Sequence, residues 1–260
     1  SYPLIFYGYH LYNLKVNEIK IFENSTNLDK AVAEKFRQNA LKAQSEGRNF
    51  SVALCGGKTP YGVYTQLAKP EFRTSVPWEV VHLFWGDERC VSPDHVESNY
   101  KMVCEALIDF IPIPGENIHR IRGEGNPELE ANRYGEEILA HFCANDEIVP
   151  NFDWILLGLG TDGHTASLFS KKDIFSLGKN VCLVTTHPQT GQKRITLTLP
   201  IINQAIFITF ICKGPGKAGV IADIIGETAH GKNYPAACVH PESGNLQWWL
   251  DSDAASMLKK

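Results

Sequence analysis

Runs of apolar residues alternate along this chain with stretches of helical periodicity, and this alternation limits the fold more than any other feature. The runs at residues 50–54, 80–85 and 154–157 contain no Asp, Glu, Lys or Arg. Strands of this kind are buried on both faces, which is typical of parallel sheets whose strands are connected by helices. The sequence therefore predicts an α/β fold, with a mainly parallel sheet and helices on both faces, in one domain over residues 1–260.

The remaining elements are predicted from apolar periodicity and from capping residues. Ser98 is expected to cap one helix, and Asn126 with Pro127 to open another. Further strands are expected at residues 18–22, 181–185, 195–199, 205–211 and 236–239. Further helices are expected at residues 28–45, 60–67 and 217–227, with a final amphipathic segment at 249–258.

Charge and composition exclude several classes of protein. The net charge is −4, from 25 basic and 29 acidic residues, so a general binder of nucleic acid or of anionic membranes is not expected. Residues 1–16 hold only a short apolar run, broken by Gly8 and His10, and predict neither a signal peptide nor a membrane helix. We therefore expect a cytoplasmic protein, whose positive charge toward any anionic ligand is local.

Cysteine and histidine spacing indicates neither a disulfide framework nor a metal site. The seven cysteines are scattered and form no CxxC pair, so reduced thiols are expected. The histidines outside residues 158–164 show no HExxH or other recurrent ligand spacing. The sequence therefore predicts no metal.

The segment CGGKTP at residues 55–60 joins a predicted strand to a predicted helix. Gly56 and Gly57 allow a sharp turn, and Lys58 and Thr59 add a charge and a hydroxyl. The free amides of a helix N-terminus bind phosphate well. This segment matches neither a Walker loop nor a dinucleotide fingerprint, so a phosphate site and a plain strand-to-helix turn both remain open.

The segment GDER follows the predicted strand at 80–85. Asp87, Glu88 and Arg89 leave that strand together, and an arginine can bind phosphate or carboxylate oxygens with two parallel hydrogen bonds. A structural ion pair at a strand end is the alternative reading. Asp87 and Arg89 are kept as candidate ligand contacts.

The segment GLGTDGH at residues 158–164 follows the predicted strand at 154–157. Its glycines, Gly160 among them, allow backbone amides to face a ligand, and Asp162 and His164 lie two residues apart. Histidine titrates near neutral pH and can exchange a proton with water, while a nearby carboxylate can orient its ring. Because ligands gather beyond the carboxyl ends of parallel strands, we expect this loop to carry the working histidine of an enzyme.

Two further basic residues lie near strand or helix ends. Arg194 precedes an apolar strand, and Lys217 follows the sequence GPG. Each is either a solvated surface charge or part of a phosphate clamp beside residues 55–60.

Together these motifs resemble the 6-phosphogluconolactonase family over nearly the whole chain and in the same order. The resemblance rests on CGGKTP, on WGDER with SNY at 98–100, on LLGLGTDGHTASLF, on KRITLTLPIIN and on GPGKA. It departs from the usual pattern at Cys55 and Lys58, where the family usually has serine, and at Ser170, where it usually has proline.

The resemblance implies a modified Rossmann-like fold, shared with sugar-phosphate isomerases, and hydrolysis of 6-phosphogluconolactone to 6-phosphogluconate in the pentose phosphate pathway without a cofactor. It implies that His164 is the general base, supported by Asp162, and that Arg89 lies beside the ligand. Arg194 and Lys217 would hold the phosphate. The only partner expected is the small-molecule substrate, with no nucleic acid or membrane, and we expect a monomer. The full set of predicted substrate contacts is Gly56, Gly57, Lys58, Thr59, Asp87, Arg89, Gly160, Arg194 and Lys217.

Two other functions remain open. Glucosamine-6-phosphate deaminases resemble DGHIAFNEP where this chain has DGHTASLFS, which puts Phe169 in place of the glutamate that supports the deaminase histidine. A non-catalytic sugar-phosphate sensor would share the fold, but such sensors usually carry a basic helix-turn-helix, and none is recognisable here.

Overall fold

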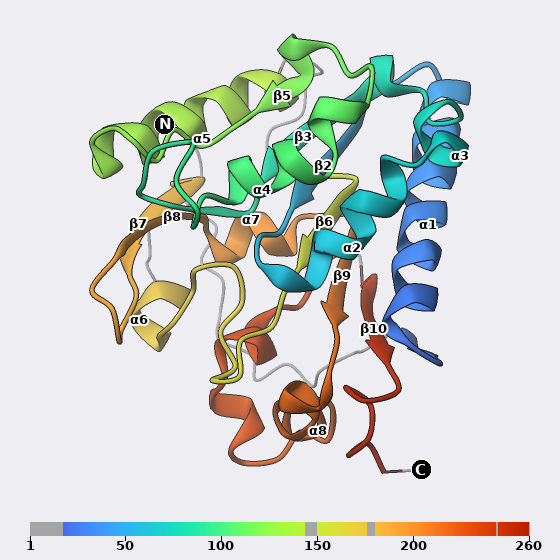
Figure 1. Ribbon diagram of the computed structural model, residues 1–260. Coiled ribbons are helices and arrows are strands. Elements are labelled where there is room, and N and C mark those ends of the chain that lie inside the picture. The colour runs from blue at the N-terminus through green and yellow to red at the C-terminus, as the bar shows by residue number, and fades with distance from the viewer. Residues whose placement is uncertain (1–17, 144–149, 176–179, 243, 260) are drawn as a thin grey trace.

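The described part of the chain forms two β-sheets with helices packed around them (Figure 1). The computed structural model describes residues 18–143, 150–175, 180–242 and 244–259. The larger sheet has seven strands in the order β1-β10-β9-β6-β2-β3-β5, and every neighbouring pair is parallel. Its strands are β1 (Glu18–Phe22), β2 (Phe50–Leu54), β3 (Val81–Trp85), β5 (Ile118–His119), β6 (Trp154–Leu157), β9 (Phe207–Cys212) and β10 (Leu246–Asp251). The predicted α/β class with a mainly parallel sheet is confirmed.

The smaller sheet is antiparallel, in the order β4-β8-β7. Its strands are β4 (Asp87–Arg89), β8 (Lys193–Leu197) and β7 (Cys182–Thr186). The sequence predicts strands close to β7 and β8, but apolar runs do not show which strands pair. Its strand β4 follows β3 after the single residue Gly86. The smaller sheet therefore lies beside the carboxyl end of β3.

Helices cover the two faces of the larger sheet. Phe36 of α1 packs against Phe50 and Trp154 on one face, while Phe142 of α5 packs against Phe84 on the other. Phe84 pairs with Ala53, which is three residues from Phe50 on β2. Because side chains alternate along a strand, Phe50 and Phe84 point to opposite faces. The helices are α1 (Ser25–Ser45), α2 (Lys58–Leu67), α3 (Pro70–Arg73), α4 (Asn99–Ala106), α5 (Pro127–Cys143), α6 (Lys171–Ile174), α7 (Leu199–Asn203) and α8 (Ala218–Ile225).

Two predicted elements at the C-terminal end of the chain are wrong. The strand expected at 236–239 is a 3₁₀ turn, Pro235–Cys238. The amphipathic segment expected at 249–258 begins inside β10, which lies between β1 and β9 and buries both Trp248 and Trp249. A strand paired on both sides and covered on both faces shows no polar alternation, so the tryptophan pair marked a core strand rather than the start of a helix.

Residues 1–16, for which the sequence predicts neither a signal peptide nor a membrane helix, lie outside the described residues. Within the described ranges, no helix combines the length and apolar character that crossing a membrane requires. The six cysteines whose side chains are described are free thiols, and Cys55, Cys182 and Cys212 among them are buried.

Candidate active site

The predicted site motifs follow neighbouring strands of the larger sheet. CGGKTP follows β2, GDER follows β3 and GLGTDGH follows β6. These strands are parallel neighbours in the order β6-β2-β3, so their carboxyl ends, and the three motifs, lie at the same end of the sheet. The chain runs from β2 to β3 on one side and from β6 to β9 on the other, so the strand order reverses between β2 and β6. Such a reversal is where open α/β sheets bind ligands.

His164 and Asp162 are in direct contact in the loop after β6. His164 Nδ1 lies 2.5 Å from Asp162 Oδ1, and the side chains are 29% and 48% exposed. Burial raises the pKa of Asp162, but the charge and hydrogen bonds of His164 outweigh it and lower that pKa overall. The Asp162 carboxylate can accept a hydrogen bond from Nδ1–H, and in that tautomer the free lone pair of His164 lies on Nε2.

Gly160 makes room for this pair. A Cβ at Gly160 would lie 2.2 Å from His164 Nδ1 and 2.3 Å from Asp162 Oδ1, closer than any real Cβ contact. The amide of Gly160 donates to the carbonyl of His164 at 2.8 Å and closes the loop. Lys217, just before α8, donates from Nζ to the carbonyl of Leu159 and so lies against the same loop.

Arg89 and Arg194 form a second centre on the smaller sheet. They are register partners across β4 and β8, and Arg194 is only 8% exposed. Among the described residues neither guanidinium has a carboxylate within 4.0 Å, and the Nε of each is buried without a hydrogen-bond partner. Burial, followed by the charge of Arg89, lowers the pKa of Arg194. Arg89 also donates from Nη1 to the carbonyl of Glu97, and two adjacent guanidinium groups without carboxylate partners are well suited to an anionic ligand.

Phe169 and His187 connect the two centres. The Phe169 ring lies 4.9 Å from the His164 ring and 5.0 Å from the His187 ring, centre to centre. Burial, followed by the charges of Arg194 and His164, lowers the pKa of His187. His187 follows β7 and was not predicted as a site residue, because an isolated histidine after a strand carries no recognisable pattern.

Ser167 joins the loop after β6 to the smaller sheet. Its Oγ donates to Asp87 Oδ2 at 2.6 Å, its amide donates to Thr196 Oγ1 at 3.3 Å, and its carbonyl accepts from Thr185 Oγ1 at 2.9 Å. These three partners lie on β4, β8 and β7. Asp87, predicted to contact substrate, is 7% exposed and binds the loop through Oδ2.

Glu88 has a structural role. Its carboxylate accepts from the amides of Arg89, Asn99 and Tyr100 at 2.7 to 2.8 Å, which satisfies the first turn of α4. Ser98 caps the same helix, as predicted, by accepting from the amide of Lys101 at 3.1 Å.

The loop at residues 55–60 is held by contacts that its own sequence does not show. Gly57 is the N-cap of α2, with φ of +87° and no side-chain cap, so the first amides of α2 have no side-chain acceptor there. The carbonyl of Thr59 accepts from Lys213 Nζ at 2.7 Å, and Lys213 also pairs with Asp29. Lys58 is exposed. The loop thus offers a helix N-terminus beside the His164 loop.

Comparison with known proteins places this arrangement in a family. The family model described as glucosamine-6-phosphate isomerases/6-phosphogluconolactonase matches residues 23–248. The chain belongs to this family. A 6-phosphogluconolactonase from Aggregatibacter actinomycetemcomitans is 42% identical over 207 residues, which cover 80% of this chain and 87% of the relative.

Solved structures of similar proteins share the fold. One described as "devB protein" is 38% identical, covers 93% of this chain and 99% of its own, and gives a TM-score of 0.86. The 6-phosphogluconolactonase from Thermotoga maritima is 28% identical, covers 90% and 99%, and gives a TM-score of 0.75. The predicted family resemblance and the predicted fold are confirmed.

Two departures from the usual family pattern have structural explanations. Ser170 caps α6, since its Oγ accepts from the amide of Asp173 at 3.3 Å while the Asp173 carboxylate accepts from the amide of Ser170 at 2.9 Å. Burial, followed by the charge of Asp87, raises the pKa of Cys55 to about 12. Cys55 is therefore a protonated core thiol and not a nucleophile.

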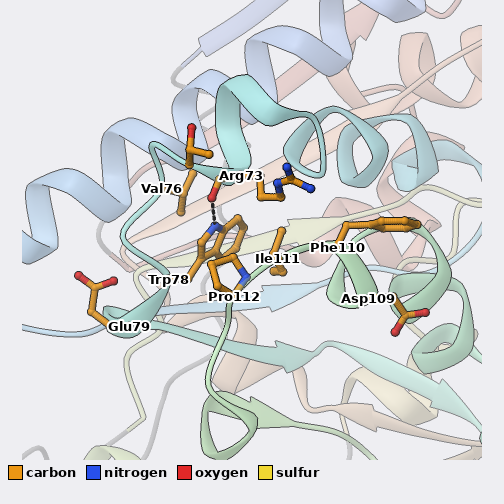
Figure 2. A pocket seen from close by; sticks show the side chains of 9 residues that line it. Arg73, Val76, Trp78, Glu79, Asp109, Phe110, Ile111 and Pro112 are labelled. Atoms are coloured by element: carbon orange, nitrogen blue, oxygen red, sulfur yellow. Dashed lines mark hydrogen bonds between the residues drawn. The ribbon is translucent and has the colours of Figure 1, made fainter.

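A hollow lies on the surface away from these residues. It has a volume of about 730 Å³ and lies between α3 and the segments that precede β3 and β5 (Figure 2). Trp78 forms part of its wall, held by a bond from Nε1 to the carbonyl of Arg73 at 3.0 Å. Because Trp78 lies before the amino end of β3, this hollow is near the amino ends of the strands, whereas the site loops follow their carboxyl ends.

Proposed function

We propose that this protein is a 6-phosphogluconolactonase, which hydrolyses 6-phospho-D-glucono-1,5-lactone to 6-phospho-D-gluconate in the oxidative pentose phosphate pathway. The observation that carries the proposal is the 2.5 Å contact between His164 and Asp162. Their loop is bound through Ser167 to the sheet that holds two arginines without carboxylate partners. Named lactonases among the relatives support it.

In the proposed reaction His164 acts as the general base. Its Nε2 takes a proton from water while the water oxygen bonds to C1 of the lactone, and the carbonyl electrons move onto oxygen. Asp162 stabilises the imidazolium that forms. When the tetrahedral oxyanion collapses, the bond from C1 to the ring oxygen breaks and His164 returns its proton to that oxygen.

The positive groups divide between oxyanion and phosphate. Arg89 would stabilise the oxyanion, since donors aimed at developing charge contribute most in a partly buried site. Arg194 and Lys217, with the amides at the start of α2, would hold the phosphate. We propose no cofactor, because addition of water to an ester needs only a base and oxyanion stabilisation.

Two features oppose the alternatives from the same family. The ring of Phe169 packs against His164, where the deaminase pattern has a glutamate. A sensor would need the arginine pair but has no use for a carboxylate-oriented histidine.

The decisive experiment measures opening of freshly made 6-phosphogluconolactone, corrected for the spontaneous rate. Saturable acceleration that is lost in His164→Ala supports the proposal. Ammonia release from glucosamine 6-phosphate would replace it with the deaminase, and binding of 6-phosphogluconate without turnover would replace it with the sensor.

A further inference from the structure

Three histidines far apart in sequence come together at the outer edge of the larger sheet. His82 lies on β3, His119 on the edge strand β5 and His141 on α5. Each offers a ring nitrogen, and these nitrogens all lie within 4.8 Å of one another. All three side chains are partly exposed, so solvent and small ions can reach them.

One pair of ring nitrogens is spaced nearly as in a metal site, and the nitrogen of His141 lies within 4.8 Å of both. His82 Nδ1 and His119 Nε2 are 3.0 Å apart. Two imidazole nitrogens bound to zinc at about 2.0–2.1 Å in a tetrahedral arrangement are about 3.3 Å apart. A shift of a few tenths of an ångström would therefore replace the contact between the two rings by two bonds to one ion.

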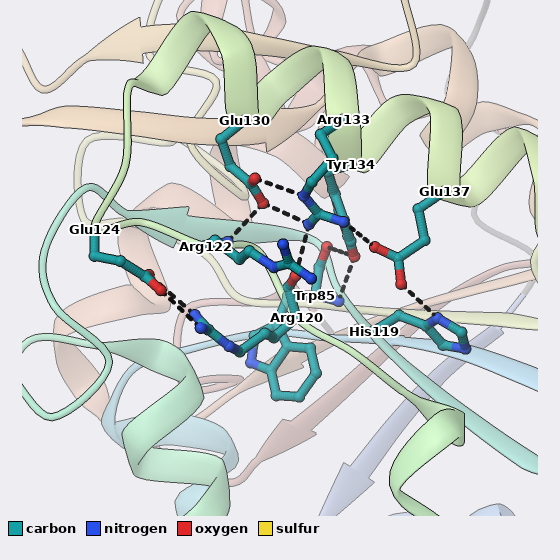
Figure 3. A network of polar contacts seen from close by, with 9 residues as sticks. All are labelled: Trp85, His119, Arg120, Arg122, Glu124, Glu130, Arg133, Tyr134 and Glu137. Atoms are coloured by element: carbon teal, nitrogen blue, oxygen red, sulfur yellow. Dashed lines mark hydrogen bonds and ion pairs between the residues drawn. The ribbon is translucent and has the colours of Figure 1, made fainter.

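The surroundings of the cluster match what metal-binding histidines require. His119 Nδ1 lies 2.8 Å from Glu137 Oε1, and Glu137 is itself paired with Arg133 (Figure 3). A carboxylate that accepts from one ring nitrogen fixes the tautomer and makes the other nitrogen a better ligand. The Ser51 hydroxyl lies 2.7 Å from His141 Nε2 and can donate or accept there.

Aromatic rings fix the orientation of two of the three histidines. Phe84 stacks on His119 at 4.2 Å with an angle of 8° between the rings, and the edge of Phe142 meets His141 at 5.0 Å and 89°. Rings held in this way lose little freedom when an ion binds, which lowers the entropic cost of binding.

From this geometry we infer that His82, His119 and His141 bind a divalent ion of the zinc class, with water as the fourth ligand. Three neutral imidazoles suit zinc and its neighbours, and exclude the oxygen-seeking calcium and magnesium. The ion would tie β5 to α5 and lies apart from His164. The sequence predicts no metal because the three ligands come from three separate elements and have no local spacing.

Zinc binding is tested on the whole metal-stripped protein by competition with a chromogenic chelator. We expect one equivalent of Zn²⁺ to bind, and Co²⁺ to give the intense visible absorption of a tetrahedral site with nitrogen ligands. His82→Asn and His141→Asn each weaken Zn²⁺ binding at least about 100-fold, and Glu137→Gln weakens it about 10–100-fold with every direct ligand in place.

Two histidine variants serve as controls. His95→Asn alters a side chain that is 46% exposed, and His164→Asn alters the proposed active site, and both keep wild-type Zn²⁺ affinity. Absence of stoichiometric binding to the wild type overturns the inference. Loss of binding in His164→Asn, or its retention in Glu137→Gln and both cluster variants, overturns it as well. If a cluster variant fails to fold, Glu137→Gln and the Co²⁺ spectrum of the wild type decide.

Discussion

Arg89 and Arg194 face each other across β4 and β8, and among the described residues neither pairs with a carboxylate. Like charges directly opposite on a sheet destabilise it, and burial of Arg194 adds to the cost. Under the proposed roles this arrangement becomes favourable when substrate binds, because the phosphate then faces Arg194 and the oxyanion formed at C1 faces Arg89.

Replacement of Arg194 by alanine should therefore weaken phosphate binding. We expect Arg194→Ala to raise KM about 10–100-fold, the equivalent of a charge-assisted hydrogen bond, with a smaller change in kcat. Steady-state kinetics on 6-phosphogluconolactone measure both. Arg194→Lys keeps the charge but loses the planar fork and should recover only part of the effect. Lys42→Ala, at a side chain 70% exposed, is the matched surface control, and an equal KM for Arg194→Ala and this control would place Arg194 outside the clamp.

Removal of the proposed base should abolish most of the reaction. His164→Ala is expected to lower kcat about 10²–10⁴-fold while far-UV circular dichroism stays unchanged. Asp162→Asn keeps the His164 ring but removes the negative charge that stabilises its imidazolium form, so we expect a smaller loss of kcat. A nearly normal rate in His164→Ala would remove the general-base assignment.

Gly160 offers a test that leaves every catalytic side chain in place. In Gly160→Ala the new methyl group would overlap His164 Nδ1 and Asp162 Oδ1, and these flexible side chains, not the backbone, would move. We expect kcat to fall about 10–100-fold, because small displacements of catalytic groups are costly. Gly158→Ala is the matched control in the same loop, since its Cβ would meet no atom within 4 Å. Equal rates for the two variants would show that the pair tolerates displacement.

The histidine cluster should make the metal-free protein sensitive to acid. Burial, followed by the charges of His141 and His119, lowers the pKa of His82 to about 4. Burial, followed by the charge of His119, also lowers the pKa of His141 to about 4, although the charge of Glu137 raises it. Between pH 6.5 and 4 the unfolded chain then binds more protons than the folded protein, so stability falls as pH falls.

Urea denaturation in EDTA at pH 7 and pH 5 measures this loss. We expect on the order of 1–2 kcal/mol from the two histidines together, after allowance for their partial exposure. His82→Gln should show a smaller pH dependence than the wild type. An identical pH dependence in that variant would assign the acid sensitivity to other groups.

The fold was predictable where apolar runs and caps are local. Phe50–Leu54 and Trp154–Leu157 are strands with the predicted bounds, and Ser98 caps its helix. Pairing was not predictable. Nothing in residues 193–197 shows that they join β4 in a second sheet, because an apolar run does not specify its neighbour.

The geometry of the candidate site was predictable to a similar degree, while the roles of its residues stay predictions. The positions of His164 and Asp162 follow from a loop at a strand end, and their contact is observed. Lys213, which holds the carbonyl of Thr59, was missed because an isolated lysine carries no sign of its partner. The same holds for His187, whose place beside Phe169 depends on the second sheet.

The bonds from Ser167 to all three strands of the smaller sheet have a consequence for substrate choice. His164 precedes Ser167 by three residues, and Arg89 and Arg194 lie on two of those strands. Under the proposed roles, these hydrogen bonds connect His164 and Arg89, at the attacked carbonyl, to Arg194, at the phosphate, and so help to set the distance between the two ends of the substrate. The protein would then select substrates by the distance between lactone carbonyl and phosphate, and would discriminate against sugar lactones whose chain is one carbon shorter or longer.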